Sequence, residues 1–466
     1  MSSLNVDVLF LVFGELESDN KSLYSCILVN KAWCATAIPI LWRNPGQYLI
    51  KKHSKNILSN VILSHIPTDI LKFLDSEFFE KTYQRPFYNY IHFWKYLDIT
   101  YITNIFSKFS TDKFNEIIKL FINKNTKISH LTIGYGFDCH DCRLHLIPGA
   151  ECCLSELESL HVNVDMRIDI LEGLATICKS IKKLRIDSLC SFYNSYYGII
   201  RLIEVQENLN DVDIRRPLIG CDDYNKTFEE SLIKHADTIK YLRINWKPNT
   251  SILSYLVNLV SIDLKDTRKA DWSQLEEVSL PLLKILKAKA IPYKYIENLI
   301  KSTKGNLSEI SICYDSLNSR MLIQIIYHNC PNLRYLKLVL LDNIDSLFIK
   351  AFEILLTNSQ FLNELNIRVN NDTFGWKELF EILTKSSSIN LFKFYFYFNK
   401  KFKLEDLKFF FDNWKDKNPM LLIINTFSLV NKVKQESEDL MQEYKTNGII
   451  KRFEVYKNHY KDFEWN

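Results

Sequence analysis

An apolar pattern that recurs along most of the chain constrains its fold more than any other feature of the sequence. The pattern is Leu-x-x-Leu-x-Leu, in which other apolar residues can replace leucine, and it occurs fourteen times at intervals of 20 to 34 residues. The units begin at Trp94, Ile128, Leu157, Ile181, Leu209, Ile239, Leu259, Leu283, Leu307, Leu333, Leu362, Leu391, Leu421 and Ile450. A period of this length, held over so many copies, indicates an array of stacked supersecondary units.

Each unit combines a strand with a helix. The segment LRYLKLVL at 333–340 alternates with period two, which is typical of a strand with one buried face. The segment TDKFNEIIKLFI at 111–122 places Phe114, Ile117 and Phe121 on one face of a helix. Such a unit cannot bury its apolar face alone, so its neighbours must stack against it. The sequence therefore predicts an α/β solenoid with strands on the concave face and helices outside.

This array resembles leucine-rich-repeat proteins over roughly residues 90 to 460, and in particular the long-repeat, helix-containing kind found behind F-boxes. The family's Asn or Cys, eight residues after the first Leu, is present as Asn370, Asn399 and Asn458, whereas other units carry residues such as Pro217 and Thr267. The resemblance implies a leucine-rich-repeat solenoid over residues 94–466, with a weakened side-chain ladder in its middle.

The first 45 residues differ from the array and resemble the F-box. The resemblance rests on Leu4, Asp7, Val8, Leu9, Phe13, Leu16, Leu23, Leu28, Val29, Trp33, Leu41 and Trp42. Where the family has Leu-Pro this chain has Leu4-Asn5, so we expect Asn5 or Asp7 to cap the first of three helices instead of proline.

Physical reasoning also points to a partner for this N-terminal segment. Val8 to Phe13 is a run of six apolar residues, so the helix is apolar all round and keeps an uncovered face unless something docks there. In the F-box family that partner is a Skp-type adaptor, and through it the cullin and RING subunits of a ubiquitin ligase. The resemblance implies adaptor contacts at Leu4, Asn5, Val8, Leu9, Phe13, Leu16, Leu28, Val29 and Trp33. The alternative is that these helices only cap the end of the solenoid.

Residues 46–93 form a mixed helical and extended joint in this interpretation. Their apolar density, including IPTDILKFL at 66–74, predicts packing against the first repeat, because a flexible linker would be rich in Gly or Ser.

Composition narrows the class of partner and the compartment. Hydrophobic residues make up 47% of the chain and charged residues 24%, so we expect it to fold throughout. A net charge of +4, from scattered basic residues, argues against nucleic acid or an anionic membrane as the main partner. The start of the chain lacks a cationic signal-peptide region, and the 11 cysteines show no disulfide framework, which predicts a cytoplasmic or nuclear protein.

The sequence shows one cluster of candidate metal ligands and no catalytic signature. Cys139, Cys142, His145 and Cys152 or Cys153 could form a zinc set, but a second half-site with the usual spacing is missing. The alternative is a loop with free thiols between repeats. We therefore predict no bound metal and no cofactor. Phosphate loops, HExxH and GxSxG are absent from the sequence, so we expect no enzymatic activity.

The repeat also indicates which side chains line the concave face, because alternation turns the residue between the last two apolar positions of each strand outward. These residues are Asp98, Thr132, His161, Arg185, Asp213, Arg243, Asp263, Lys287, Ser311, Lys337, Asn366, Tyr395, Asn425 and Glu454. The predicted substrate-binding residues are Lys287, Lys337, Arg368, Tyr395, Tyr397 and Phe427, since Tyr and Arg often anchor protein interfaces. The alternative is a bulky strand whose Phe394, Phe396 and Phe398 fill the core.

Two classes of function follow from these patterns. The first is a non-catalytic adaptor that holds a ligase core with residues 1–45 and a substrate protein of unknown identity with the repeats. The second is a leucine-rich-repeat binding scaffold whose partners have nothing to do with ubiquitin.

Overall fold

The computed structural model divides the chain into two compact units, Met1–Thr238 and Ile239–Asn466. It describes residues 5–48, 52–67, 70, 85–107, 109–134, 143–162, 168–187, 193–215, 222–248, 250–265, 272–313, 319–340, 345–369, 375–398, 402–425 and 431–456. Within these residues no helix combines the length and apolar character that crossing a membrane requires.

Three helices open the first unit: α1 (Val6–Glu15), α2 (Asn20–Ile27) and α3 (Lys31–Leu41). Asn5, Asp19 and Asn30 cap their N-termini through side-chain oxygens that accept backbone N–H groups, which confirms the predicted role of Asn5. The helices enclose a small core of their own. It consists of Leu9, Phe13, Leu23, Cys26, Ala37 and Ile40, with Leu16, Ile27, Trp33 and Leu41 packed against it.

The rest of the first unit alternates strands with helices, as the repeat predicts. Its elements are η1 (Pro45–Tyr48), α4 (Lys52–Ser64), η3 (Tyr90–Phe93), β1 (Tyr96–Asp98), α6 (Ile99–Ile105), α7 (Thr111–Phe121), β2 (His130–Ile133), η4 (Leu144–Leu146), α8 (Ala150–Cys153), β3 (Ser159–Val162), α9 (Ile168–Ile177), β4 (Lys183–Ile186), α10 (Tyr193–Glu204), β5 (Asp211–Ile214) and α11 (Asp222–Ile233). Strands β1 to β5 pair in parallel and in chain order.

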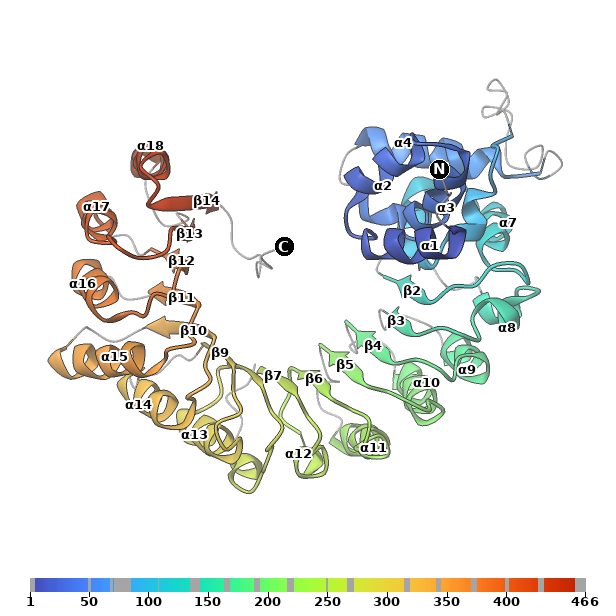
Figure 1. Cartoon of the computed structure of the whole chain (residues 1–466). Helices are drawn as coiled ribbons and strands as arrows, with labels where there is room; N and C mark the ends of the chain where they lie inside the picture. The colour runs from blue at the N-terminus through green and yellow to red at the C-terminus, as the bar shows by residue number, and fades with distance from the viewer. Residues whose placement is uncertain are drawn as a thin grey trace. The chain divides into compact units, whose positions relative to one another are not determined.

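The second unit continues the same alternation. Its elements are β6 (Tyr241–Ile244), α12 (Ile252–Tyr255), β7 (Ser261–Lys265), η5 (Ser273–Glu276), β8 (Ile285–Lys289), α13 (Tyr293–Ser302), β9 (Glu309–Cys313), α14 (Ser319–Asn329), β10 (Tyr335–Leu340), α15 (Ser346–Asn358), β11 (Glu364–Val369), α16 (Trp376–Ser386), β12 (Lys393–Tyr397), α17 (Leu404–Asp412), β13 (Met420–Asn425), α18 (Asn431–Thr446) and β14 (Ile450–Tyr456). Strands β6 to β14 are parallel and follow chain order. In each unit the helices lie side by side on one face of the strands, which confirms a repeat solenoid (Figure 1).

The register of the strands tests the repeat residue by residue. The fourth residue of one predicted unit pairs with the fourth of the next, as in Leu131 with Leu160 and Leu336 with Leu365. The unit predicted to begin at Leu421 is wrong by two residues, because Phe394 pairs with Leu422. Strand β13 reads MLLIIN and lacks the alternation that fixes which residues face the core.

A recurring backbone contact joins one repeat to the next. In each case one carbonyl accepts two successive N–H groups of the following unit, as the Lys95 carbonyl does from Ser129 and His130. The first carbonyl of the series belongs to Arg43, just after α3, and it accepts from Lys95 (2.9 Å) and Tyr96 (3.1 Å). The N-terminal helices are thus joined to the edge of β1 as a preceding repeat would be.

The described residues of the segment between α3 and β1 contact one another and the end of α3, whereas most of the stretch IPTDILKFL at 66–74 lies outside the described residues. The rings of Trp42 and Tyr90 lie 4.4 Å apart, and the Tyr90 N–H donates to His65 Nε2 over 3.1 Å. Leu58, Ile62 and other side chains of α4 are buried.

Aromatic side chains fill the core of the second unit between β12 and helices α16 and α17. Phe394, Phe396 and Phe398 are at most 1% exposed, and they contact Trp376 and Phe410 among other rings. The interpretation of LFKFYFYFNKKFK as a bulky core strand is therefore confirmed for these phenylalanines.

Candidate functional site

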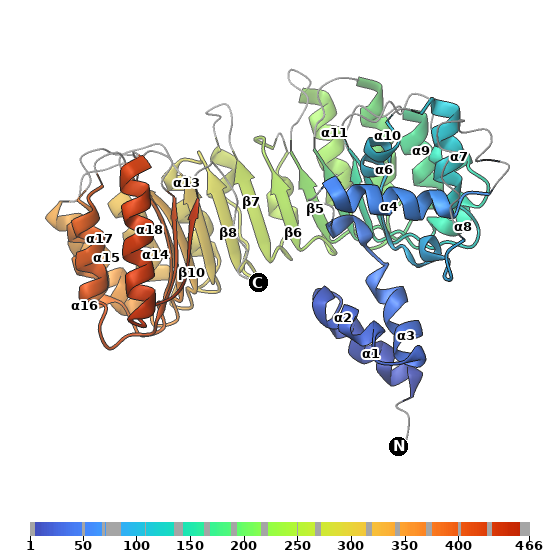
Figure 2. The same cartoon turned by 90° about the horizontal axis from the view of Figure 1, so that it is seen from above.

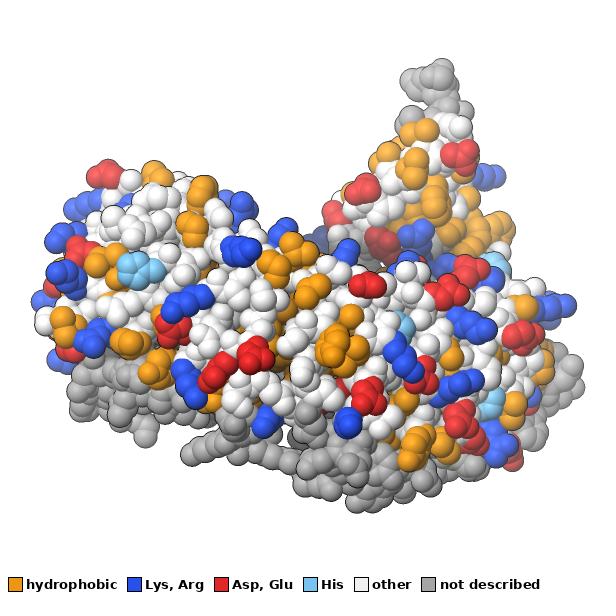
Figure 3. Space-filling view, turned by 90° about the horizontal axis from the view of Figure 1, so that it is seen from below, with side chains coloured by type: hydrophobic (Ala, Val, Ile, Leu, Met, Phe, Trp, Pro, Cys, Tyr) orange, Lys and Arg blue, Asp and Glu red, His pale blue; other side chains and the backbone are white. Residues whose placement is uncertain are grey.

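The most distinctive surface of the first unit is an exposed apolar face on α1 and α2. Side chains at least 43% exposed there are Val6, Val8, Phe10, Leu11, Val12, Tyr24, Leu28 and Val29, which we call the N-terminal apolar face. Leu11 and Leu28 are 71% and 73% exposed. Hydrophobic side chains gather on these helices in Figure 3. The inner side of the same helices is already occupied by the core around Phe13, so this face is not needed for folding.

The structure divides the predicted adaptor-binding residues into three groups. Val8, Leu28 and Val29 lie on the N-terminal apolar face. Leu9 and Phe13 are at most 3% exposed, and Leu16 and Trp33 are partly buried against them, so these side chains support the face from behind. Asn5 caps α1, and Leu4 lies outside the described residues.

The apolar face also includes residues that the family pattern did not single out. Phe10, Leu11 and Val12 belong to the apolar run that predicted an uncovered helix face, but the run alone did not show which side was covered. At its border the guanidinium of Arg43 lies 5.4 Å from the Phe10 ring centroid and pairs with Glu17 at 2.9 Å.

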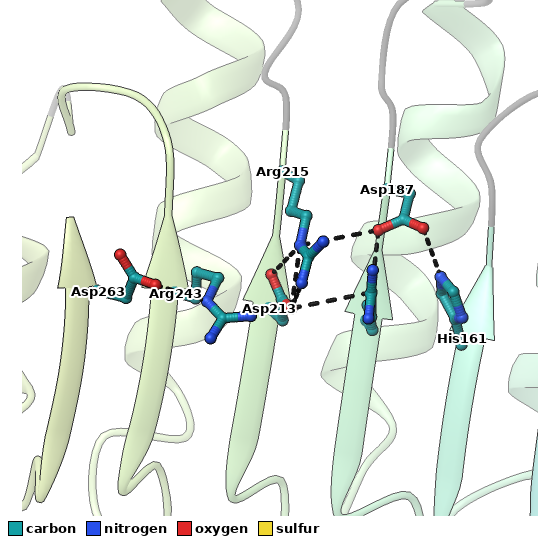
Figure 4. A network of polar contacts seen from close by, with 7 residues as sticks. His161, Asp187, Asp213, Arg215, Arg243 and Asp263 are labelled. Carbon is teal, nitrogen blue, oxygen red and sulfur yellow. Dashed lines mark hydrogen bonds and ion pairs between the residues drawn. The ribbon is translucent and has the colours of Figure 1, made fainter. Parts of the chain in front are cut away.

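A network of charged side chains crosses the exposed face of strands β3 to β5 (Figure 4). Asp187, at the end of β4, accepts from His161 Nε2 at 2.7 Å and from Arg185 Nε at 2.9 Å. Arg215 Nη2 donates to Asp213 at 2.9 Å. Two longer ion pairs join these contacts, Arg185 with Asp213 at 3.8 Å and Arg215 with Asp187 at 3.9 Å. Burial alone would raise the pKa of Asp187, but the hydrogen bonds from Arg185 and His161 outweigh it and lower the pKa. Positive and negative groups thus neutralise each other on this face.

The predicted substrate-binding residues lie on the corresponding face of the second unit. Lys287 on β8, Lys337 on β10, Arg368 on β11 and Tyr395 and Tyr397 on β12 alternate with buried residues and are partly exposed. The Arg368 guanidinium stacks over the Tyr397 ring at 4.5 Å. The structure therefore places these five on one face. Asn425, which was predicted to face outward, is only 1% exposed, and the predicted substrate-binding residue Phe427 lies outside the described residues.

Only part of the candidate zinc cluster can be placed. Cys139 and Cys142 lie outside the described residues. The Cys153 thiol is buried beside Thr126 Oγ1 at 3.2 Å, and this burial raises its pKa. Cys152 is exposed, and the His145 ring packs so closely on Gly173 that a Cβ there would lie 2.1 Å from it. Within the described residues, no three or more His, Cys, Asp or Glu side chains are arranged to hold a metal.

The fold defines a protein built of strand-and-helix repeats. No family model matches the chain, and no curated protein is similar to it in sequence. Among solved structures it is similar to a chain in the crystal structure of the Rad7 and Elc1 complex in yeast, with 14% identity and a TM-score of 0.40. The similarity covers 72% of this chain and 88% of that chain.

Proposed function

We propose that the chain is the substrate-recognition subunit of a Skp/cullin/F-box ubiquitin ligase. In this proposal helices α1 to α3 are an F-box that binds a Skp-type adaptor, and the leucine-rich repeats bind a substrate protein. The chain itself performs no bond chemistry, and it acts in the cytoplasm or nucleus by holding the substrate near subunits that transfer ubiquitin.

The observation that carries the proposal is the N-terminal apolar face. It places eight exposed apolar side chains on helices whose core is already filled. Burying a half-exposed apolar side chain stabilises a complex by roughly 1 kcal/mol. A partner that covered this face would therefore gain a large binding free energy. Exposed apolar side chains gathered on one part of a surface are typical of a protein interface. The F-box resemblance of the same segment supplies the identity of the partner.

The second candidate function, a binding scaffold capped by its N-terminal helices, is favoured by the backbone contact of Arg43. Its carbonyl accepts the N–H groups of Lys95 and Tyr96 at the edge of β1, which is what a cap requires. This contact uses the segment after α3 and leaves the N-terminal apolar face uncovered. Capping is therefore compatible with adaptor binding and does not account for the exposed residues.

The test is co-purification of the full chain with a Skp-type adaptor and cullin from the same cells, followed by titration with purified adaptor. The variant Leu11→Asp/Leu28→Asp places two charges on the apolar face without touching the core. Leu347 and Ile389 are 54% and 58% exposed in the second unit, so Leu347→Asp/Ile389→Asp is a matched control.

We expect the first variant to lose adaptor and cullin, with affinity at least roughly tenfold weaker, because charges enter the centre of an apolar interface. The control should bind as the unchanged chain does, and circular dichroism should show both variants folded. If the unchanged chain brings down no adaptor, or the first variant binds it normally, the scaffold interpretation replaces this one.

A further inference from the structure

Strand β14 lies at an open edge of the sheet in the second unit. It pairs with β13 on one side, and among the described residues no strand pairs with its other side. With seven residues it is the longest of the described strands. Helix α18 lies at the same end of this unit, next to α17 (Figure 2). An edge strand of this length presents a row of backbone N–H and C=O groups to which another strand can pair.

The core side of β14 is incompletely covered. Phe453 is the register partner of Leu422, and Val455 is the register partner of Ile424. Both β13 residues are fully buried, whereas both β14 residues are partly exposed. The difference follows from the position of β14, because β13 has a neighbouring strand on each side. A strand that paired with β14 would therefore bury apolar surface as well as backbone groups.

The other side of β14 carries a charged pair. Arg452 Nη2 donates to Glu454 Oε1, and Tyr456 Oη donates to Glu454 Oε2 at 2.6 Å. The Arg452 side chain is 54% exposed and that of Glu454 25%. A guanidinium and a carboxylate each have more hydrogen-bonding sites than these contacts use. Both groups can therefore bind a further group of opposite charge without losing the present contacts.

The strand is complementary to itself when two copies run antiparallel about Phe453. In that register Arg452 of each copy lies opposite Glu454 of the other, and the two Phe453 side chains lie opposite each other. Lys451 then lies opposite Val455. Directly opposite Cβ atoms in an antiparallel pair are about 4.5 to 5.5 Å apart, so two charge pairs and one aromatic pair can form.

Other arrangements of the same two strands are less favourable. A two-fold axis at Arg452 would place two guanidinium groups opposite each other, and an axis at Glu454 would place two carboxylates opposite each other. Parallel pairing in register would place like against like at every position. Like charges directly opposite each other destabilise a sheet, so charge selects the antiparallel register about Phe453.

A second copy of the chain fits this edge better than the edge at β1 or a strand of another protein. At β1 the carbonyl of Arg43 accepts the N–H groups of Lys95 and Tyr96. A strand of another protein would need the same order of acid, aromatic and base by coincidence. A second copy always carries it.

We propose that the chain forms a two-fold symmetric dimer by antiparallel pairing of its β14 edges, with Arg452 opposite Glu454 of the other copy. The interface is isologous, so it closes with two copies. The inference goes beyond the proposed function and is independent of it, because β14 belongs to the second unit and the N-terminal apolar face to the first.

The test is analytical ultracentrifugation of the full purified chain and of two charge reversals, Arg452→Glu and Glu454→Arg. Each reversal alone places like charges opposite each other in the paired edges. In an equimolar mixture the acidic strand of one variant meets the basic strand of the other, so a dimer with one copy of each can form. As controls, Lys301→Glu and Glu297→Lys reverse the charges of a surface ion pair of α13, 2.6 Å apart.

We expect the unchanged chain to dimerise with a Kd of roughly 1 to 100 µM, because one pair of edge strands buries less surface than a standard interface. Each reversal at β14 should weaken dimerisation at least roughly tenfold, and mixing the two variants should restore it. The double variant Arg452→Glu/Glu454→Arg exchanges the charges and should dimerise with itself. Both α13 controls should dimerise as the unchanged chain does, and circular dichroism should show every variant folded.

Three results would overturn the inference. The first is a full chain that stays monomeric at roughly 100 µM. If deletion of residues 457–466, which lie outside the described residues, made such a chain dimeric, those residues would be the occupant of the edge. The second is a mixture of the two β14 reversals that stays monomeric while the unchanged chain is dimeric. The third is loss of the dimer in Leu11→Asp/Leu28→Asp, which would place the contact on the N-terminal apolar face.

Discussion

Replacing Gln206 should destabilise the first unit strongly, because its buried side chain connects two repeats. The side chain is 5% exposed. Its Oε1 accepts from the Ile181 N–H at 2.9 Å, and its Nε2 donates to the carbonyls of Cys178 at 2.9 Å and Leu202 at 2.6 Å. In Gln206→Leu the buried N–H of Ile181 and the buried carbonyl of Cys178, both between α9 and β4, lose their partner.

Each unsatisfied buried group costs about 1 to 3 kcal/mol, so we expect the free energy of unfolding to fall by about 3 kcal/mol after the gain from the added apolar surface. Urea unfolding followed by circular dichroism measures the change. Hydrogen exchange over 168–204 should show that the loss is local, since the two units need not unfold together. Gln360→Leu, at an exposed position with one hydrogen bond, is the control and should change stability by less than about 0.5 kcal/mol. A loss below about 1 kcal/mol for Gln206→Leu would refute the reasoning.

Three further predictions concern the N-terminal helices, protonation and the contacts between repeats. Phe13→Ala should destabilise helices α1 to α3 by about 3 to 5 kcal/mol and Leu11→Ala by less than about 0.5 kcal/mol in thermal unfolding, since Phe13 is 1% exposed and Leu11 71%; equal losses would contradict the assigned core. Burial lowers the pKa of His130 and His235, so the unfolded chain takes up protons first and the melting temperature should fall as pH drops below about 6.5; a His130→Gln/His235→Gln variant with an unchanged pH profile would argue against this cause. Asn390→Ala removes a 2.9 Å hydrogen bond to a carbonyl of the preceding repeat and should cost about 0.5 to 1 kcal/mol in urea unfolding, and no measurable change would show that this contact is replaced by water.

The repeat could be predicted from sequence because its signal is local and is confirmed many times. The alternation in a unit such as LRYLKLVL predicts both the strand and its buried face. The register of Leu336 with Leu365 follows from aligning the units. The prediction failed at β13, because the continuous apolar run at Met420–Ile424 fits the repeat pattern in more than one register.

The candidate sites were only partly predictable, for a different physical reason. A run of six apolar residues shows that a helix must be covered, but which residues are inside depends on where α2 and α3 pack. Phe13 and Leu11 are equally apolar, yet one is core and the other surface. Charge pairing between repeats, as in Arg243 with Asp263, required the observed register.

One signal between repeats was present in the sequence and was missed. Asn306, Asn332 and Asn390 stand directly before the first apolar residue of their units, and each side chain donates to a carbonyl of the preceding repeat. Asn418 makes the same contact one residue before the corrected start of its unit.

The carbonyl of Arg43 has a consequence for the exposed edge of the sheet at β1. In the first unit, strands β2 to β5 each receive this backbone contact from the repeat before them, and β1 receives it from the segment after α3. If residues 1–45 were removed by proteolysis or deletion, the N–H groups of Lys95 and Tyr96 would form an open sheet edge, which is a template for pairing with other chains. Such a truncated chain would tend to self-associate as well as lose its N-terminal apolar face, so point substitutions on that face separate partner binding from solubility where deletion cannot.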